Sequence, residues 1–530
     1  MLRSFMRGGA ATALVLGLAG WPAGAGMAQT AAPVPLVVPA PSAAPAAVPA
    51  PAVAPAPVVS DSAAVSPAAA ATLANTIDAG LRQWLPIGGA KSGWKWSGKP
   101  QVTPAGDHYD VGLPSLSLVD DDGSSVKVGI VKMTMAPLAG GAWQVGMTVP
   151  SQMQIIAADG KPDGELTIGS QRFSGRWLPS LGIFTAMDGE YGAVTAASKK
   201  DTSRLEIASL IAKADTTEKP AGLWSGPGTF AASGVVMTDE HGVELARVGR
   251  VAVETVVTGM DLAGLVKAGS NPEIGRHPEM LRGLLGGVSG KLIVSDATVT
   301  SPGDGNAFSI KEISTHGGIE GLSGEQTSIS FGYGHSGLKL NPSPAPAEFT
   351  PDRVKLDLAV SALPNAKLWA AVEALLKPPA PEQTEDTLSE QFSQAVLAAL
   401  SEAGSRVSIK ALDISAPISS AEIKGDATFD SKAAFGMVAG VDMVVRDLEA
   451  AIKTLQPAPG TKADEDTQKT LATLGLIQAL GVPGKDAAGR DTRTYKFSLG
   501  GDGKVMLNGT DMSAIIQGFE GPSHGPADKP

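Results

Sequence analysis

The six histidines are the residues of this chain best suited to acid–base or metal chemistry. They are His108, His241, His277, His316, His335 and His524. No two of them stand at the short spacing typical of metal ligands, and each lies in or beside a predicted turn or loop. The chain also has no Cys, which excludes thiolate metal sites, cysteine nucleophiles and disulfides. We therefore expect no metal site and no cofactor.

Three short motifs resemble catalytic signatures but lack the required context. The Gly332–Gly337 string contains a serine, yet a nucleophile elbow needs glycine where Leu338 stands. Ser92–Lys95 matches S-x-x-K but lies in a predicted aromatic strand rather than at a helix start. Gly226–Ala231 fits a loose dinucleotide fingerprint, but strand-like sequence follows it where a helix is needed. We expect no catalytic residues and no enzymatic activity; the enzyme alternative is a carboxylate-dependent hydrolase, whose acid pair the sequence does not locate.

Tryptophan is concentrated in the first β-rich region. The residues concerned are Trp94, Trp96, Trp143, Trp177 and Trp224. One interpretation is a binding platform on which sugar rings stack. The other, which we favour, is that they are core anchors in a sheet that has few other large side chains.

The segments that carry these residues are mostly predicted strands. Trp143, Val145, Met147 and Val149 alternate with small or polar residues, which is typical of a half-buried strand. The alternation that begins at Val126 changes phase near Val131, which predicts a β-bulge. Three turn signals separate the strands: Asp120–Gly123, Asp159–Gly164 and Asp188-Gly189. This spacing of strands and turns favours an antiparallel meander over βαβ units.

The second half of the chain mixes strands with amphipathic helices. A strand around Val354–Val360 leads into a helix that begins at Pro364-Asn365, and a second helix ends near Gly404. Two further helices are expected at about 441–455, with Asp442 as its N-cap, and at about 464–480. A hairpin with strands at Tyr495–Leu499 and Val505–Leu507, joined by a turn at 500–503, closes this half.

The predicted fold class is α+β, dominated by an antiparallel β-sheet in a long meander with interspersed amphipathic helices. Arg-Val pairs at Arg247, Arg353 and Arg406 each open a predicted strand, and helices follow the first two. Repeated sheet-plus-helix units and chance both account for this pattern, and the choice stays open.

The N-terminal residues predict where the protein works. Arg3 and Arg7 precede an apolar stretch, Ala10–Trp21, that is too short to span a bilayer, and Gly26–Ala28 fits a signal-peptidase site. We expect an exported periplasmic protein, soluble after cleavage and without an integral membrane span. The predicted N-terminal divisions are a cleavable signal peptide (1–28) and a disordered, low-complexity Pro/Ala-rich linker (29–72). A β-rich antiparallel domain (73–345), a mixed strand/helix domain (346–519) and a disordered tail (520–530) follow. The mixed domain is either separate from the β-rich domain or continuous with it.

The formal net charge of −11 argues against partners that carry many phosphates. It becomes more negative when Arg3 and Arg7 leave with the signal peptide, and no basic stripe offsets it. Nucleic acid is therefore not an expected partner.

The closing hairpin resembles the ending of uncharacterised Gram-negative periplasmic proteins of the YdgA type. The matching residues are Tyr495–Leu499, the Gly-Asp-Gly turn and Val505–Gly509, about 20 residues in all. The whole arrangement of strands and helices is distantly similar to AsmA-like proteins. This resemblance implies a cell-envelope location, no established enzymatic activity, and the handling of lipid or outer-membrane assembly. The chain departs from both groups because it has a cleavable signal instead of a retained membrane anchor.

Three hypotheses follow. The first is a non-enzymatic periplasmic protein whose β-sheet offers an apolar groove to a lipid or an envelope protein. The second is a carbohydrate- or peptidoglycan-binding protein that uses the tryptophans. The third is the carboxylate-dependent hydrolase. The oligomeric state and the identity of the ligand are not encoded in any pattern of the sequence.

Overall fold

The computed structural model describes residues 65–85, 93–269, 283–301, 305–343, 346–376, 385–457, 462 and 464–513. Antiparallel β-structure dominates, as predicted. The chain divides into two compact units, of which unit 1 ends at Glu312 and unit 2 begins at Ile313. The predicted domain boundary after residue 345 lies inside unit 2. The predicted signal peptide, most of the predicted linker and the predicted tail lie outside the described residues.

Helix α2 (Pro67–Trp84) opens the described part of unit 1. It begins at Pro67, inside the segment predicted as linker, because Ser66 is a good N-cap and Pro67 suits the first helical position. The Ser66 hydroxyl accepts a hydrogen bond from the Ala69 amide at 3.2 Å. The Tyr109 hydroxyl accepts one from the Ser66 amide at 2.9 Å, which attaches the start of the helix to β3. The buried side of the segment carries Ala70, Leu73, Ile77, Leu81 and Leu85.

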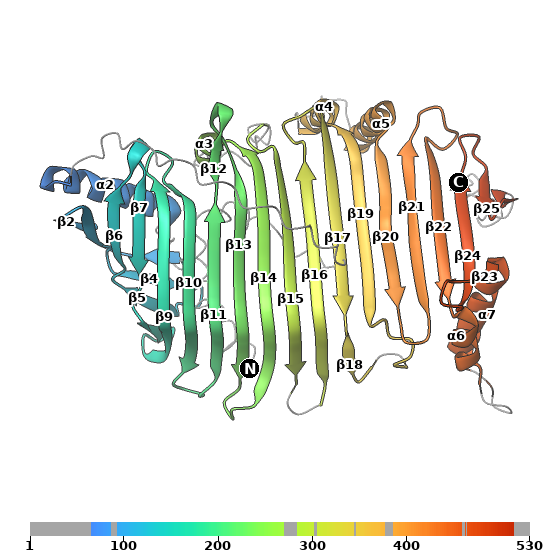
Figure 1. Ribbon diagram of the computed structural model, residues 1–530, viewed down its shortest axis with the longest axis horizontal. Helices are drawn as coiled ribbons and strands as arrows, with labels where there is room; N and C mark the ends of the chain where they lie inside the picture. Colours follow the sequence, from blue (N-terminus) through green and yellow to red (C-terminus); the bar gives the residue numbers. More distant parts are fainter. Residues whose placement is uncertain are drawn as a thin grey trace, which may run out of the picture. The chain divides into compact units, whose positions relative to one another are not determined.

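Unit 1 is built almost entirely of antiparallel strands (Figure 1). They are β1 (Gly93–Lys95), β2 (Gln101–Ala105), β3 (His108–Gly112), β4 (Leu116–Val119), β5 (Ser125–Gly129), β6 (Lys132–Pro137), β7 (Trp143–Thr148), β8 (Gln152–Ile156), β9 (Pro162–Leu178), β10 (Ile183–Ser198), β11 (Arg204–Asp215), β12 (Thr217–Lys219), β13 (Leu223–Thr238), β14 (Glu244–Met260) and β15 (Gly287–Thr300). The short helix α3 (Leu262–Gly269) follows β14, and β16 (Ala307–Glu320) crosses the boundary between the units.

Two ribbons join the same edge of β9. The ribbon β2–β3–β6–β7 pairs with the end of β9 near Trp177, and the ribbon β1–β4–β5–β8 pairs with its beginning near Thr167. The other edge of β9 pairs with β10, and the meander then continues through β11, β13, β14 and β15. Helix α2 packs its apolar side into the core that these ribbons form with β9–β11.

The predicted bulge near Val131 is wrong, because the chain changes ribbon there. Strand β5 ends at Gly129, whose φ of +87° suits glycine, and β6 begins at Lys132. Strand β5 pairs with β4 and β8, whereas β6 pairs with β3 and β7. The change of phase in the sequence therefore records a move between two ribbons rather than an extra residue in one strand.

The turn signals at Asp120 and Asp159 mark hairpins as predicted, whereas the one at Asp188-Gly189 does not. Both residues lie inside β10, where Gly189 stands opposite Phe173 of β9. A Cβ at Gly189 would lie 3.3 Å from the Phe173 ring, so glycine leaves room for the aromatic side chain. Glycine is therefore needed at position 189 for packing against Phe173 and does not form a turn there.

Unit 2 continues with antiparallel strands and longer helices. Its strands after β16 are β17 (Gln326–Ser336), β18 (Lys339–Asn341), β19 (Arg353–Pro364), β20 (Arg406–Ser415), β21 (Ser420–Phe429), β22 (Met437–Arg446), β23 (Val482–Lys485), β24 (Asp491–Leu499), β25 (Val505–Leu507) and β26 (Thr510–Asp511). Strands β17, β19, β20, β21, β22 and β24 pair in that order. Strands β23 and β25 pair with two parts of the remaining edge of β24, and the predicted β24–β25 hairpin is confirmed.

Helices α4 (Asn365–Leu376) and α5 (Glu385–Ala403) connect β19 to β20, as predicted, and lie at the ends of these strands (Figure 1). The Asn365 side chain donates hydrogen bonds of 2.8 Å to the carbonyl oxygens of Gly321 and Gly324, which attaches α4 to the turn before β17. Within the described residues, no helix has the length and hydropathy needed to cross a membrane.

Helices α6 (Leu448–Leu455) and α7 (Glu465–Leu480) precede β23. Asp442 is not an N-cap: it lies inside β22, opposite Lys424 and Lys496. The strand extends to Arg446 because its many valines favour β-structure and cross-strand pairs stabilise it. Asp464 caps α7 by accepting the Thr467 amide at 2.8 Å.

The Arg-Val pairs occupy different positions in their strands. Arg353 and Arg406 each open a strand, but Arg247 lies inside β14. A helix follows β14 and β19. The repeat of sheet-plus-helix units stays a prediction.

Candidate functional site

One side of the unit 2 sheet is apolar across six strands. Residues paired directly across antiparallel strands point to the same side, so the register assigns each side chain to a face. Three adjacent rows run from β17 to β24. The first is Tyr333, Leu356, Leu412, Ile423, Met443 and Tyr495; the second is Phe331, Leu358, Ile409, Gly425, Val441 and Phe497; the third is Ile329, Val360, Val407, Ala427, Ala439 and Leu499. We call these three rows the apolar face.

The apolar face contains no charged side chain and only two hydroxyl groups, both of which are engaged. The Tyr333 hydroxyl lies 2.6 Å from Nδ1 of His335, in the next row along β17. The Tyr495 hydroxyl donates to the Ile477 carbonyl oxygen of α7 at 2.7 Å. Burial raises the pKa of both tyrosines, so they stay neutral at physiological pH. A molecule lying on this face therefore meets hydrocarbon.

Most side chains of the apolar face remain partly exposed to solvent, whereas Tyr495 at its α7 end is buried. The exposed fraction is 38% for both Phe331 and Phe497, which lie in the second row on the outermost of the six strands. Both clusters of buried apolar side chains found among the described residues belong to unit 1. Apolar surface that stays partly exposed among the described residues is typical of a binding site.

The opposite side of the same sheet is polar. Glu422 accepts hydrogen bonds from Lys424 at 2.6 Å and from Arg446 at 3.0 Å, and these contacts lower its pKa. Asp413, directly opposite Glu422, has a raised pKa because it is partly buried and because Glu422 is negative. Asp413 and Glu422 thus have pKa values shifted in opposite directions. Carboxyl pairs with this property can act as a general acid and a general base, so the pair fits part of the hydrolase hypothesis. The hydrolase reading stays a prediction.

The row next to the apolar face, towards the start of β19, has a polar side chain at each end and four apolar residues between them. It includes His335 on β17 and Arg493 on β24. His335 lies 3.4 Å from the Pro351 carbonyl oxygen through Nε2, and burial lowers its pKa. Arg493 forms an ion pair with Glu449 of α6. Apolar surface therefore continues through the middle strands of this row, and polar groups lie only on its two outer strands.

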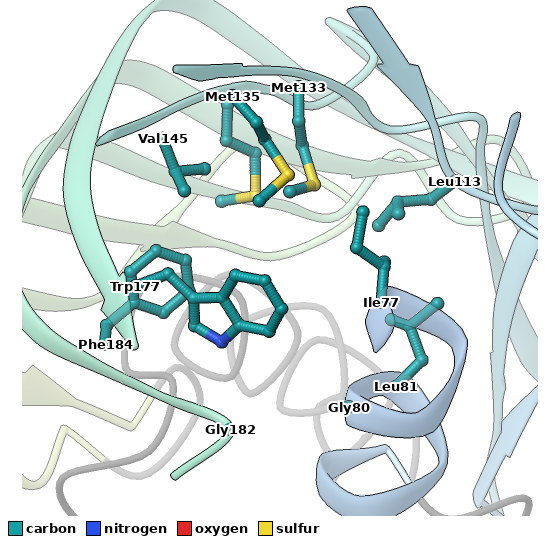
Figure 2. A pocket seen from close by; sticks show the side chains of 11 residues that line it. Ile77, Gly80, Leu81, Leu113, Met133, Met135, Val145, Trp177, Gly182 and Phe184 are labelled. Atoms are coloured by element: carbon teal, nitrogen blue, oxygen red, sulfur yellow. The ribbon is translucent and has the colours of Figure 1, made fainter. Parts of the chain in front are cut away.

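A second apolar feature, a cavity beneath α2, lies in unit 1 (Figure 2). Its lining comes from α2, β6, β7, β9, β10 and neighbouring loops. The lining residues are Ile77, Gly80, Leu81, Leu113, Met133, Met135, Val145, Met147, Trp177, Gly182 and Phe184. Met133 and Met147 are direct cross-strand partners, which places their side chains on the same side of the sheet. The sequence indicated the methionine alternation but not the helix that closes over it.

The five tryptophans, for which core anchors were the favoured interpretation, all lie in unit 1, and Trp143 stands directly opposite Trp177 in the β7–β9 pairing. Trp177 and Trp224 are buried, with exposed fractions of 7% and 9%. Trp143 packs against Tyr109, with ring centroids 5.8 Å apart. Trp94 and Trp96 are partly buried against the core. These positions favour the interpretation as core anchors, and a sugar-stacking role stays a prediction.

A polar depression of about 540 Å³ lies on another part of unit 1, between β4, β5, β8 and the start of β9. Ser117, Lys127, Gln154 and Glu165 form one cross-strand row along it. Sequence reasoning did not identify it, because the row exists only once four strands are in register. Across the described ranges, no group of three or more His, Asp or Glu side chains is placed to hold a metal ion.

The chain matches no protein-family model, and a search of curated proteins finds no significant match. The resemblance of the closing hairpin to YdgA-type proteins therefore stays a prediction.

Proposed function

We propose that this protein binds lipid non-covalently, with acyl chains lying on the apolar face of unit 2. The observation that carries the proposal is the difference in polarity between the two sides of the β17–β24 sheet. Three adjacent rows present partly exposed hydrocarbon, whereas the ion pairs of Glu422, Asp357 and Asp426 lie on the opposite side. Covering apolar surface releases about 25 cal/mol per Å², which favours an apolar ligand here.

The chemistry of the face favours acyl chains over a protein partner. Protein–protein interfaces of standard size carry roughly ten direct hydrogen bonds in addition to their apolar contacts. The two hydroxyls of the apolar face are already engaged by His335 and Ile477, and its strands are paired with one another. An acyl chain needs no hydrogen bonds over its length, so it suits a surface that offers none.

This proposal includes export to the periplasm, which rests on the N-terminal residues and on the resemblance to envelope proteins. The carbohydrate-binding alternative has one supporting observation, the polar depression near Lys127 and Glu165, whose hydroxyl, amide and charged groups suit a hydrated ligand. The apolar face has the larger number of contributing residues, and lipid is therefore the favoured ligand class.

The test places the same charge on opposite sides of one strand. Leu358 lies in the central row of the apolar face, and Ala359 points to the polar side between Ser330 and Ser408. The mature chain and its Leu358→Lys and Ala359→Lys variants would be purified gently from a periplasm. Native mass spectrometry, followed by solvent extraction, would then measure bound lipid.

We expect stoichiometric lipid on the wild type and on Ala359→Lys, and loss of lipid from Leu358→Lys, because a desolvated ammonium group is costly beside an acyl chain. Circular dichroism would verify that both variants are folded. Lipid-free wild-type protein, or equal lipid on the two variants, would contradict the proposal.

A further inference from the structure

The cavity beneath α2 in unit 1 has a lining suited to a single hydrocarbon chain. Figure 2 shows the Trp177 indole on one side and Ile77 and Leu81 of α2 on the other, with Met133 and Met135 above them. Among the lining side chains, the Trp177 indole nitrogen is the one hydrogen-bonding group. The cavity lies under the second half of α2, whereas the first half packs closely on the core through Ala70 and Leu73.

The size and chemistry of the cavity favour an apolar occupant over water. About 40 Å³ is open to the centre of a water-sized sphere, and a water molecule needs roughly 10–15 Å³. Space is therefore sufficient for water, but an ordered water also needs two to four polar partners. Apolar cavities of this kind stay dry and take up small apolar molecules.

Two glycines leave one side of the cavity without side chains. Gly80 lies in α2, where glycine costs about 1 kcal/mol of helix stability relative to alanine, and Gly182 lies in the loop before β10. A Cβ at Gly80 would have one neighbour within 4 Å, Cζ2 of Trp177 at 3.8 Å. The space beside Gly80 is thus open next to the indole, and the flexible thioethers of Met133 and Met135 can adapt to an occupant.

We propose that this cavity receives the methyl end of one acyl chain, which enters between Gly80 and Trp177. The volume suits the end of a chain rather than a whole lipid. The inference takes its ligand class from the function proposed above, but it rests on a separate set of residues in unit 1. It makes Trp177 a reporter of occupancy, because a bromine atom in contact with an indole quenches its fluorescence.

The experiment titrates the folded mature chain with ω-bromododecanoic acid and follows tryptophan fluorescence. The wild type should show saturable quenching, and Trp177→Phe should lose that component. Gly80→Leu fills the open side and should weaken the quenching at least tenfold. Gly475→Leu is the matched control, because Gly475 lies in α7 with nothing within 4 Å of its Cβ position, and it should leave quenching unchanged.

Two further readouts keep the test decisive. If Gly80→Leu does not fold, Gly80→Ala fits the structure without a clash and should weaken quenching in the same direction. Leu358→Lys should leave the Trp177 signal intact, so failure of the apolar face and failure of the cavity are distinguishable. Quenching that persists in Trp177→Phe, is unchanged by Gly80→Leu or Gly80→Ala, or disappears in Leu358→Lys would overturn the proposal.

Discussion

Removing one aromatic ring from the apolar face should weaken lipid binding by an amount that its exposure determines. Phe331 has an exposed fraction of 38%. A phenylalanine side chain buries on the order of 200 Å² when fully covered, so about 75 Å² is left for a ligand to cover. At about 25 cal/mol per Å² this area contributes about 2 kcal/mol. Phe331→Ala should therefore raise the dissociation constant of a bound acyl chain about 20-fold.

Phe435 provides a matched control for this substitution. It is more exposed than Phe331, with a fraction of 65%, but it lies in the turn between β21 and β22, outside the three rows of the apolar face. Phe435→Ala should leave affinity unchanged. Displacement of a fluorescent fatty acid by palmitate would measure both constants, with thermal unfolding as a check on folding. Equal effects of the two substitutions, or no effect of Phe331→Ala, would refute the assignment of the site to the apolar face.

Two further predictions concern stability. Burial and Glu422 raise the pKa of Asp413 in the folded protein, so its ionised form is disfavoured there, and Asp413→Asn should stabilise the fold at neutral pH. This gain should fade as the pH falls through the raised pKa of Asp413 and should be absent below the ordinary carboxyl pKa, as urea unfolding at two pH values would reveal. A gain that grows on acidification would contradict this sign. At Gly226 a Cβ would lie 2.0 Å from the Asp215 carbonyl oxygen. Gly226→Ala should therefore lower the free energy of unfolding of unit 1 by about 1–3 kcal/mol, measured by chemical denaturation. An unchanged denaturation midpoint would count against the packing described for β13.

The strand alternation around Leu358 was predictable, whereas the apolar face was not. Each strand contributes apolar residues at every second position, and this period is visible in the local sequence. The rows, however, require the correct register across five strand pairs, including the irregularities between Thr327 and Ile329 and between Asp357 and Leu358. A slip of one residue in any strand would turn its apolar side chains to the other face.

The errors of prediction share one cause, which is that local signals were read without their tertiary partners. Asp442 has the character of an N-cap, but pairing with Lys424 and Lys496 keeps it in β22. Asp188-Gly189 has the composition of a turn, but the Phe173 ring needs the space that Gly189 leaves in β10. Cross-strand contacts outweigh single-residue preferences at both places.

The sequence by itself determined the dominance of antiparallel β-structure, most helix positions, and the exclusion of cysteine chemistry. These properties follow from periodicity, capping residues and composition, which act over a few residues. Only the tertiary structure decided that three apolar rows lie side by side in unit 2, and that α2 closes over Trp177 and three methionines in unit 1. Both features join residues far apart in the chain, and the free energy that places them comes from packing and strand pairing, which local sequence does not encode.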